Sequence, residues 1–417
     1  MKKLGKPVPK DLEKTKAIAK GMVGEEFLEL NFANTEIAFA HKTDAELKKA
    51  AWLFGVMNKA WLVSLGSKLG LAAIRMKLPF VETMVKNTIF AQFCGGTTLL
   101  ESLPSIDQLA KFNTLTILDY GAEAKVTEDD YNQTMKETIR SIEFAKHNDN
   151  VPVVSAKISG LARFGLLENL QQGEPFTPAT RQEYKVVLKR MDAICHVACT
   201  HGVGVFFDAE ESWIQDSIDH LVTVMMRRYN REKVVVYNTF QLYRHDRLQF
   251  LFDSYQLAKR GGYKLGAKMV RGAYMDKERA RAVEMGYPSP IQPNKAATDD
   301  AFNTAIRFCV DHYEEIASCN ASHNADSARL LAELIVEKGI PRNHPHLNFC
   351  QLYGMSDHLT FNLAEAGFNV AKYVVYGQVS EVVPYLVRRA EENSSVTGDM
   401  SRELELVSRE MKRRKLS

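Results

Sequence analysis

Short apolar runs alternate with longer amphipathic segments after Thr114. Eight runs are rich in β-branched residues, and helix-length segments with 3.6-residue periodicity separate them, such as Asp246–Arg260 and Ala325–Lys338. Such alternation predicts parallel strands joined by crossover helices. Eight units over about 280 residues favour an α/β protein of the (β/α)8 barrel type, and the absence of Gly-x-Gly-x-x-Gly after the first run weakens the alternative of a doubly wound open sheet. The runs are Leu115–Tyr120, Pro152–Ser159, Gly202–Asp208, Lys233–Thr239, Tyr263–Val270, Ile316–Ser322, His346–Leu352 and Val370–Tyr376.

The N-terminal part of the chain has a helical pattern instead. From Asp44 to Leu62, apolar residues return at three- and four-residue spacing between lysines, and a similar texture continues from Leu65 to Met84. One interpretation is a helical arm packed on the barrel. The other is an amphipathic face, carrying Trp61, that touches a membrane surface. We therefore divide the chain into a helical arm (residues 1–112), a barrel (113–396) and a basic helical tail (397–417), whose closing KRRK is predicted to be a solvated helix end.

Composition and charge limit the class of protein. The 417 residues include 54 Lys and Arg against 51 Asp and Glu, and are 45% hydrophobic. This is the balance of a globular protein, and it argues against a disordered chain and a dedicated nucleic-acid binder. Six cysteines are too sparse for a disulfide framework. The longest uncharged runs, such as Asn87–Leu100, are shorter than the roughly 20 residues of a membrane span. We expect a cytoplasmic location, with peripheral contact at the inner face of a membrane as a further option.

Polar residues at the ends of the apolar runs are the first candidates for a functional site, because the carboxyl ends of barrel strands form it. Lys157 and Lys268 lie inside apolar runs and need partners once buried. Gly272 follows the fifth run, where backbone can approach a flat or phosphorylated ligand closely. Adjacent Arg388 and Arg389 suit recognition of a carboxylate or phosphate, although a solvated helix pair with Glu392 is the alternative for Arg388.

One spacing resembles a metal site but favours another interpretation. Cys195, His196, Cys199 and His201 fall within seven residues. However, the two cysteines lie one turn apart on the apolar face of a predicted helix, and no second Cys/His pair is near in the sequence. Core packing therefore explains them better than zinc, and we expect no metal.

Several motifs in order resemble the proline dehydrogenase family. They are VSAKISGL, FFDAEES, AKMVRGAYMDKERARA, ASHNAD, FCQLYGM and YVVYGQVSEVVPYLVRRAEENSS. The resemblance implies a (β/α)8 flavoprotein that binds FAD and oxidises L-proline to 1-pyrroline-5-carboxylate, the first step of proline catabolism. Hydride would pass from proline C5 to FAD N5, and electrons to a quinone or another acceptor. A hydroxyproline dehydrogenase on the same barrel is the close alternative, and a non-catalytic binding or regulatory barrel belongs to another class.

The same resemblance implies roles for matching residues. Asp208 and Lys268 would be catalytic, and Glu123 would pair with Arg388 to gate the pocket. Lys268 stands where bifunctional bacterial relatives have Arg, and Tyr373 favours proline over hydroxyproline. The implied substrate-binding residues are Lys157, Tyr274, Leu352, Tyr373, Arg388 and Arg389. The implied cofactor-binding residues are Asp208, Ala209, Gln241, Lys268, Val270, Arg271, Gly272, Ala273, Ser322, His323, Asn324 and Glu392.

Overall fold

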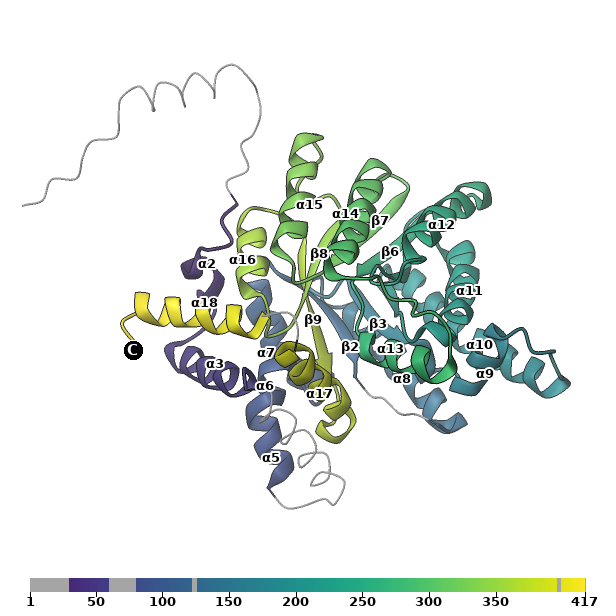
Figure 1. Ribbon diagram of the computed structural model, residues 1–417, viewed down its shortest axis with the longest axis horizontal. Helices are drawn as coiled ribbons and strands as arrows, with labels where there is room; N and C mark the ends of the chain where they lie inside the picture. The colour runs from purple at the N-terminus through teal and green to yellow at the C-terminus, as the bar shows by residue number, and fades with distance from the viewer. Residues whose placement is uncertain (1–29, 60–79, 122–125, 396–398, 417) are drawn as a thin grey trace, which may run out of the picture.

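Eight parallel strands form a closed barrel, as the computed structural model shows (Figure 1). The structure describes residues 30–59, 80–121, 126–395 and 399–416, without the side chains of 391–400. The barrel closes because β9 pairs with both β2 and β8. This confirms the predicted fold: seven of the predicted runs contain one strand each, and Lys233–Thr239 overlaps β5, which extends two residues further. The strands are β2 (Leu115–Tyr120), β3 (Val153–Lys157), β4 (Gly204–Asp208), β5 (Val236–Gln241), β6 (Leu265–Val270), β7 (Ile316–Ala321), β8 (Leu347–Leu352) and β9 (Val370–Tyr376).

Helices surround the barrel, and local sequence sets their ends. Thr177 caps the first turn of α10, Pro178 occupies its first position, and Gly202 ends it at φ 71°. The predicted helices 246–260 and 325–338 correspond to α12 and α15. The helices that follow the strands are α8 (Glu128–Ala145), α9 (Phe164–Gln171), α10 (Pro178–His201), α11 (Ser212–Tyr229), α12 (Arg247–Gly261), α13 (Met275–Met285), α14 (Lys295–Asp311), α15 (Ala325–Glu337), α16 (Asp357–Glu365) and α17 (Val379–Ser395).

The strands are apolar on both faces, and this gives the barrel two packed layers. Their outer face packs under the helices, with Phe207, Leu265 and Phe349 in one continuous core. Their inner face fills the lumen with residues such as Phe206 and Cys319. Burial on both sides explains why the strands read as near-continuous apolar runs rather than as alternating patterns.

The N-terminal arm is not wholly helical, which corrects the sequence prediction. A strand of three residues, β1 (Cys94–Gly96), pairs in parallel with β9 at Val375 and Tyr376. The pairing of β8 with β9 ends earlier, at Tyr373, so β1 continues the barrel edge beyond β8. In the described part of the arm, the helices are α2 (Thr35–Phe39), α3 (Asp44–Met57), α5 (Val81–Val85), α6 (Ala91–Phe93) and α7 (Leu99–Ala110), with a π-helical turn at Lys86–Phe90.

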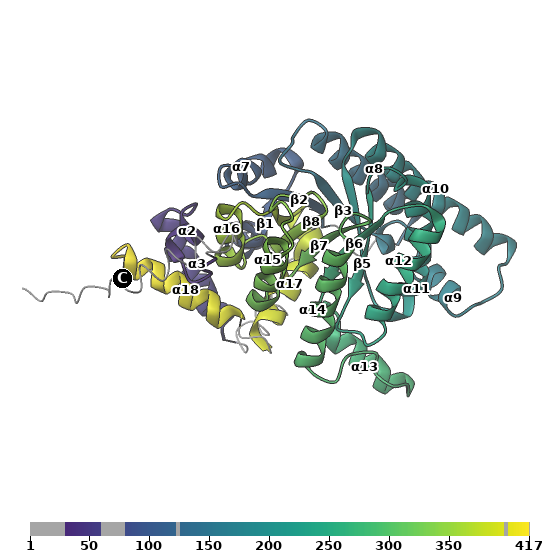
Figure 2. The ribbon, with the colours of Figure 1, turned by 90° about the horizontal axis from the view of Figure 1, so that it is seen from above.

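The C-terminal helix α18 (Asp399–Arg413) lies against α2 and α3, at the side of the barrel (Figures 1 and 2). Arg414, which follows it, donates to the carbonyls of Phe39 and Lys42, both at 2.8 Å, and pairs with Asp44 at 3.1 Å. The prediction of a simply solvated KRRK end was therefore wrong for Arg414, because its partners are 370 to 375 residues away in sequence.

The amphipathic segment that begins at Asp44 forms α3, as predicted. A capping box of Thr43 and Glu46 starts the helix, and its apolar side, including Leu47 and Phe54, is buried. Trp61 and Leu62, part of the proposed membrane face, lie outside the described residues. Among the described helices, none combines the length and hydropathy that crossing a bilayer requires.

Candidate active site

A cavity of about 350 Å³ opens at the carboxyl ends of the barrel strands. Every one of the eight barrel strands, or the residue that follows it, contributes to its wall. The lining includes Asp119 (β2), Lys157 (β3), Asp208 (β4), Gln241 (β5), Lys268 (β6), Ser322 (after β7), Leu352 (β8) and Tyr373 (β9). The sequence prediction that the strand ends converge on one cavity is therefore met by the geometry.

Lys268, Asp208 and Tyr373 form a bonded group at the bottom of this cavity. The Lys268 ammonium lies 2.5 Å from Asp208 Oδ1, and the Tyr373 hydroxyl donates to Asp208 Oδ2 at 2.7 Å. Burial by itself would raise the pKa of Asp208, but the charge and hydrogen bond of Lys268 outweigh it and hold that pKa below its usual value. The pair is therefore ionised, and the Lys268 ammonium also lies 4.6 Å from the Tyr373 ring centroid.

Asp119 lies beside this group, and its pKa is moved in the opposite direction from that of Asp208. Burial raises its pKa to about 7, helped by the negative charge of Asp208 and opposed by Lys157 and Lys268. Two carboxyl groups in one cavity thus have pKa values moved in opposite directions, an arrangement typical of functional sites. Sequence reasoning gave Asp119 no role, because nothing in the local sequence reveals its neighbours.

Positive charge dominates the wall of the cavity. Among the described residues, seven cationic side chains line it, against the carboxylates of Asp119 and Asp208. The seven are Lys157, Lys268, Arg271, Lys295, Arg388, Arg389 and Arg402. A small cavity with this excess attracts anions such as a carboxylate or a phosphate.

The loop after β6 gives the cavity one of its walls. Gly272 has φ 141°, and a Cβ there would come within 2.5 Å of the Tyr243 ring, so only glycine fits. Arg271 is held by Asp299 at 2.8 Å, Ser322 Oγ at 2.5 Å and Ser327 Oγ at 3.0 Å. Its guanidinium is thus fixed between β6 and β7 before any ligand binds.

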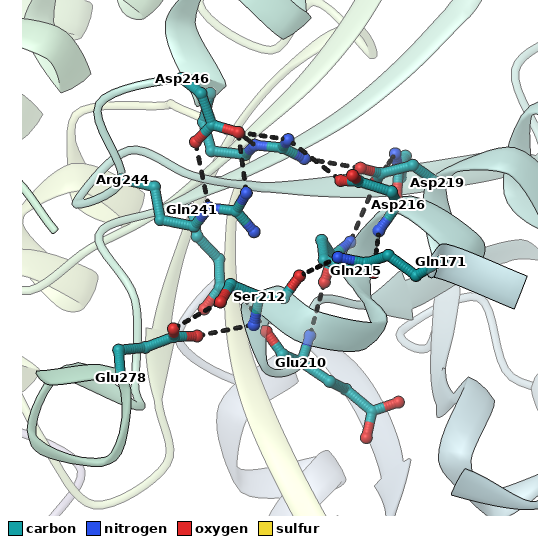
Figure 3. Close-up of polar contacts among 12 residues, drawn as sticks. Gln171, Glu210, Ser212, Gln215, Asp216, Asp219, Gln241, Arg244, Asp246 and Glu278 are labelled. Atoms are coloured by element: carbon teal, nitrogen blue, oxygen red, sulfur yellow. Dashed lines mark hydrogen bonds and ion pairs between the residues drawn. The ribbon is translucent and has the colours of Figure 1, made fainter. Parts of the chain in front are cut away.

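A network of polar contacts fixes the loop after β4 (Figure 3). The Glu210 amide donates to Gln215 Oε1 at 2.8 Å, and Gln241 Nε2 donates to the Glu210 carbonyl at 2.7 Å. The amide and hydroxyl of Ser212 both donate to Glu278 of α13 at 2.6 Å. These contacts join the loops after β4, β5 and β6 into one rigid rim.

Comparison with known proteins decides the family. The sequence profile described as "Proline dehydrogenase" matches residues 102–402. This chain belongs to the proline dehydrogenase family. It is 33% identical over 322 residues to the carbapenem antibiotics biosynthesis protein CarD of Pectobacterium carotovorum, covering 77% of this chain and 83% of that protein. It is 32% identical over 401 residues to the mitochondrial proline dehydrogenase 1 of Dictyostelium discoideum, covering 86% and 69%.

Solved structures of proline utilization A proteins share the fold. Proline utilization A of Bdellovibrio bacteriovorus, inactivated by N-propargylglycine, aligns with a TM-score of 0.67 at 20% identity, over 89% of this chain and 39% of that one. The chain therefore spans about two fifths of that larger protein. At this identity the likeness supports the (β/α)8 barrel alone.

The proline dehydrogenase family resemblance named 19 residues, and 17 of them line the cavity. The two others cannot be placed: Glu123 lies outside the described residues, and only the backbone of Glu392 is described, on α17. The lining residues that the sequence reasoning left without a role include Tyr385 and Arg402. Arg402 had no sequence signal, because it comes from the predicted tail.

A second hollow, of about 820 Å³, is lined by residues of α7, α8 and α17. Its wall mixes both signs of charge, with Glu137, Arg140, Glu143 and Lys146 among its members. None of the candidate residues lines it.

The Cys195 and Cys199 pair also lies elsewhere, on α10, and Cys199 is exposed rather than on the apolar face as predicted. Among the described residues, no group of three or more His, Cys, Asp or Glu side chains is arranged to hold a metal ion.

Proposed function

We propose that this chain is an FAD-dependent dehydrogenase that oxidises L-proline to 1-pyrroline-5-carboxylate. The observation that carries the proposal is the cavity at the carboxyl ends of the strands, where a buried Lys268–Asp208–Tyr373 group lies within a strongly cationic wall. Membership of the proline dehydrogenase family supports the same conclusion. A binding or regulatory barrel without catalysis would have no use for this costly burial of charge.

Three cationic side chains would hold the substrate carboxylate. Lys157 comes from the end of β3, whereas Arg388 and Arg389 come from α17, and all three line the cavity. Arg389 is 8% exposed and its guanidinium lies 5.4 Å from the Tyr385 ring centroid, which limits its freedom. Leu352, Tyr274 and Tyr373 would pack on the carbon ring of proline. Fixing a small ring at its charged end orients the remaining atoms for reaction.

The remaining wall fits a flavin dinucleotide. Gly272 lets the loop after β6 pack against the buried Tyr243 ring, where a Cβ would clash, and Arg271 supplies a fixed guanidinium for a phosphate. Val270, Ala273, Gln241, Ala209 and the Ser322–Asn324 turn would complete the contacts, with Glu392 as the remaining predicted member. These residues would hold a flavin that supplies the redox chemistry, namely uptake of the hydride from proline C5 and transfer of electrons to a quinone-type acceptor.

The chain's own groups would prepare the substrate for this step. Lys268 keeps a positive charge in the buried site, because Asp208 holds it there. The positive charge of Lys268 would stabilise the negative charge that builds up in the site as proline is oxidised. Tyr373 is held by Asp208, so the wall beside the substrate ring cannot relax. Proline must present a neutral amine, and we therefore expect activity to rise toward alkaline pH.

An absorbance spectrum tests the proposal. The purified full chain should carry flavin bands that bleach when L-proline is added without an acceptor. A protein that binds no flavin, or whose flavin does not bleach, contradicts it. Comparing kcat/KM for L-proline and trans-4-hydroxy-L-proline separates the two dehydrogenase alternatives, and Tyr373 leads us to expect preference for proline. The gate formed by Glu123, the acceptor and the peripheral membrane contact stay predictions.

A further inference from the structure

The C-terminal helix α18 reaches the cavity although it lies outside the barrel. Arg402, in its first turn, lines the cavity and donates to the carbonyl of His323 at 3.4 Å. His323 follows β7 and is itself a member of the wall. The side chain of Arg402 thus adds a guanidinium to the candidate site from a segment that the sequence assigned to a separate tail.

A closed set of contacts fixes Arg402 in this place. His323 Nδ1 lies 2.8 Å from Ser356 Oγ, and the Ser356 amide donates to Glu403 Oε1 at 2.8 Å. Because Glu403 follows Arg402 directly, the contacts return to the starting residue. Glu403 is 3% exposed, so this anchor is buried. Glu403 therefore attaches the helix to the barrel, and Arg402 extends into the cavity wall.

The body of α18 is also firmly packed. Val407 is fully buried and Leu406 nearly so, in the same core as Leu47 and Phe54 of α3. A helix held in this way presents Arg402 at a fixed position, which lowers the entropy lost when a ligand binds. This preorganisation is what a binding residue needs and a solvated tail lacks.

The side of the cavity that Arg402 occupies indicates its ligand. His323 lies next to Ser322, whose hydroxyl accepts from Arg271 at 2.5 Å, so Arg402 is on the β7 side with the fixed guanidinium of Arg271. Lys157, by contrast, comes from β3, four strands away in the barrel order. Lys268 is balanced by Asp208, and Arg271 and Lys295 share Asp299. The cavity still has more cationic side chains than one substrate carboxylate requires, and those on this side suit a doubly charged diphosphate.

We propose that Arg402 binds the diphosphate of the dinucleotide cofactor and that α18 closes the cofactor site. This inference rests on the proposed function, because it takes the flavin dinucleotide as the ligand. It assigns to the C-terminal helix a part in holding the cofactor, beside the residues of the barrel itself. His323 itself is neutral, since burial lowers its pKa to about 3, so the positive charge beside it comes from Arg402.

Flavin binding to the apoprotein tests this inference without measuring catalysis. The full chain is stripped of flavin, and the Kd values for FAD, FMN and riboflavin are measured by fluorescence quenching. For Arg402→Met we expect the Kd for FAD to rise about 10- to 100-fold, the usual effect of losing a charge-assisted hydrogen bond. Riboflavin, which has no phosphate, should bind within about twofold of the original protein. Arg402→Lys should retain most of the FAD affinity, because it keeps the charge.

Arg409→Met is the matched control, because Arg409 lies on the same helix and pairs only with the exposed Glu405 among the described contacts. Its FAD affinity should be that of the original protein. The inference is overturned if Arg402→Met binds FAD normally, or if it loses riboflavin as strongly as FAD, which would indicate a structural role. If the unmodified apoprotein binds no flavin at all, the proposed function fails instead, and the two failures are distinguishable.

Discussion

Lys372 and Asp357 form an ion pair at 2.8 Å in which both side chains are almost completely buried. Lys372 belongs to β9 and Asp357 begins α16, and His41 and Lys42 of the arm approach the same carboxylate at 3.3 and 3.5 Å. Although burial alone would raise it, the charges of Lys372 and Lys42 and a hydrogen bond from His41 hold the pKa of Asp357 well below its usual value. One buried carboxylate therefore joins the barrel to the arm.

Removing the lysine of this pair should strongly destabilise the protein. Lys372→Met leaves Asp357 in the interior with only Lys42 and His41 of the arm beside it. We expect a loss of about 3 kcal/mol in the free energy of unfolding. Urea unfolding followed by circular dichroism measures it. Lys338→Met, which breaks the exposed pair with Asp311, is the control and should cost at most about 1 kcal/mol. Equal losses in the two variants would contradict the stabilising role of the buried pair.

Lys268 should be needed for the reductive half-reaction. Lys268→Met removes the positive charge beside Asp208, and we expect the rate of flavin reduction by proline to fall about 100-fold. Lys268→Arg should retain a large part of the rate, since a guanidinium can also pair with Asp208. Stopped-flow absorbance measures both. An unchanged rate in Lys268→Met would remove Lys268 from the chemistry.

Arg389 should act on the substrate carboxylate. Arg389→Met should raise KM for L-proline at least about tenfold with little loss of bound flavin. Steady-state kinetics and the flavin-to-protein absorbance ratio measure the two effects. Pyrrolidine, which lacks the carboxylate, provides the internal control: its kcat/KM should be the same in variant and original protein. A normal KM for proline would exclude Arg389 from the clamp.

Glu210 should make stability depend on pH. Burial raises its pKa to about 7, although Ser159 hydrogen-bonds to it and Lys157 opposes the shift. Because the folded state binds this proton more tightly than the unfolded state, the stability it contributes at low pH is lost as pH rises from about 4 to 7, by up to about 1.4 kcal/mol per pH unit.

Glu210→Gln should therefore gain thermal stability relative to the original protein between pH 5 and pH 8. Differential scanning calorimetry at several pH values measures the difference in Tm. Glu365→Gln, at an exposed position of α16, is the control and should show a nearly constant difference. A difference in Glu210→Gln that is flat across this range would show that the buried carboxyl does not change its charge on folding.

The sequence predicted the barrel and most of the site for one physical reason. Strands buried on both faces leave continuous apolar runs, and parallel closure brings all their carboxyl ends to one rim, so polar residues such as Lys157 and Asp208 had to meet. The pattern missed β1, because Cys-Gly-Gly is too short and too rich in glycine to show a period. It also missed Arg402, because a helix outside the barrel reveals its contacts only through tertiary packing.

The pairing of β1 with β9 also constrains the order of events during protein synthesis. Cys94 pairs with Val375, so about 280 further residues must be synthesised before β1 can pair with β9. Arg414 meets the carbonyl of Phe39 still later. Because a contact between distant residues can form only after both have been synthesised, this chain completes its barrel edge only once β9 has left the ribosome. Until then, the newly made arm lacks its packing partners, and chaperones bind the apolar surface that such segments expose.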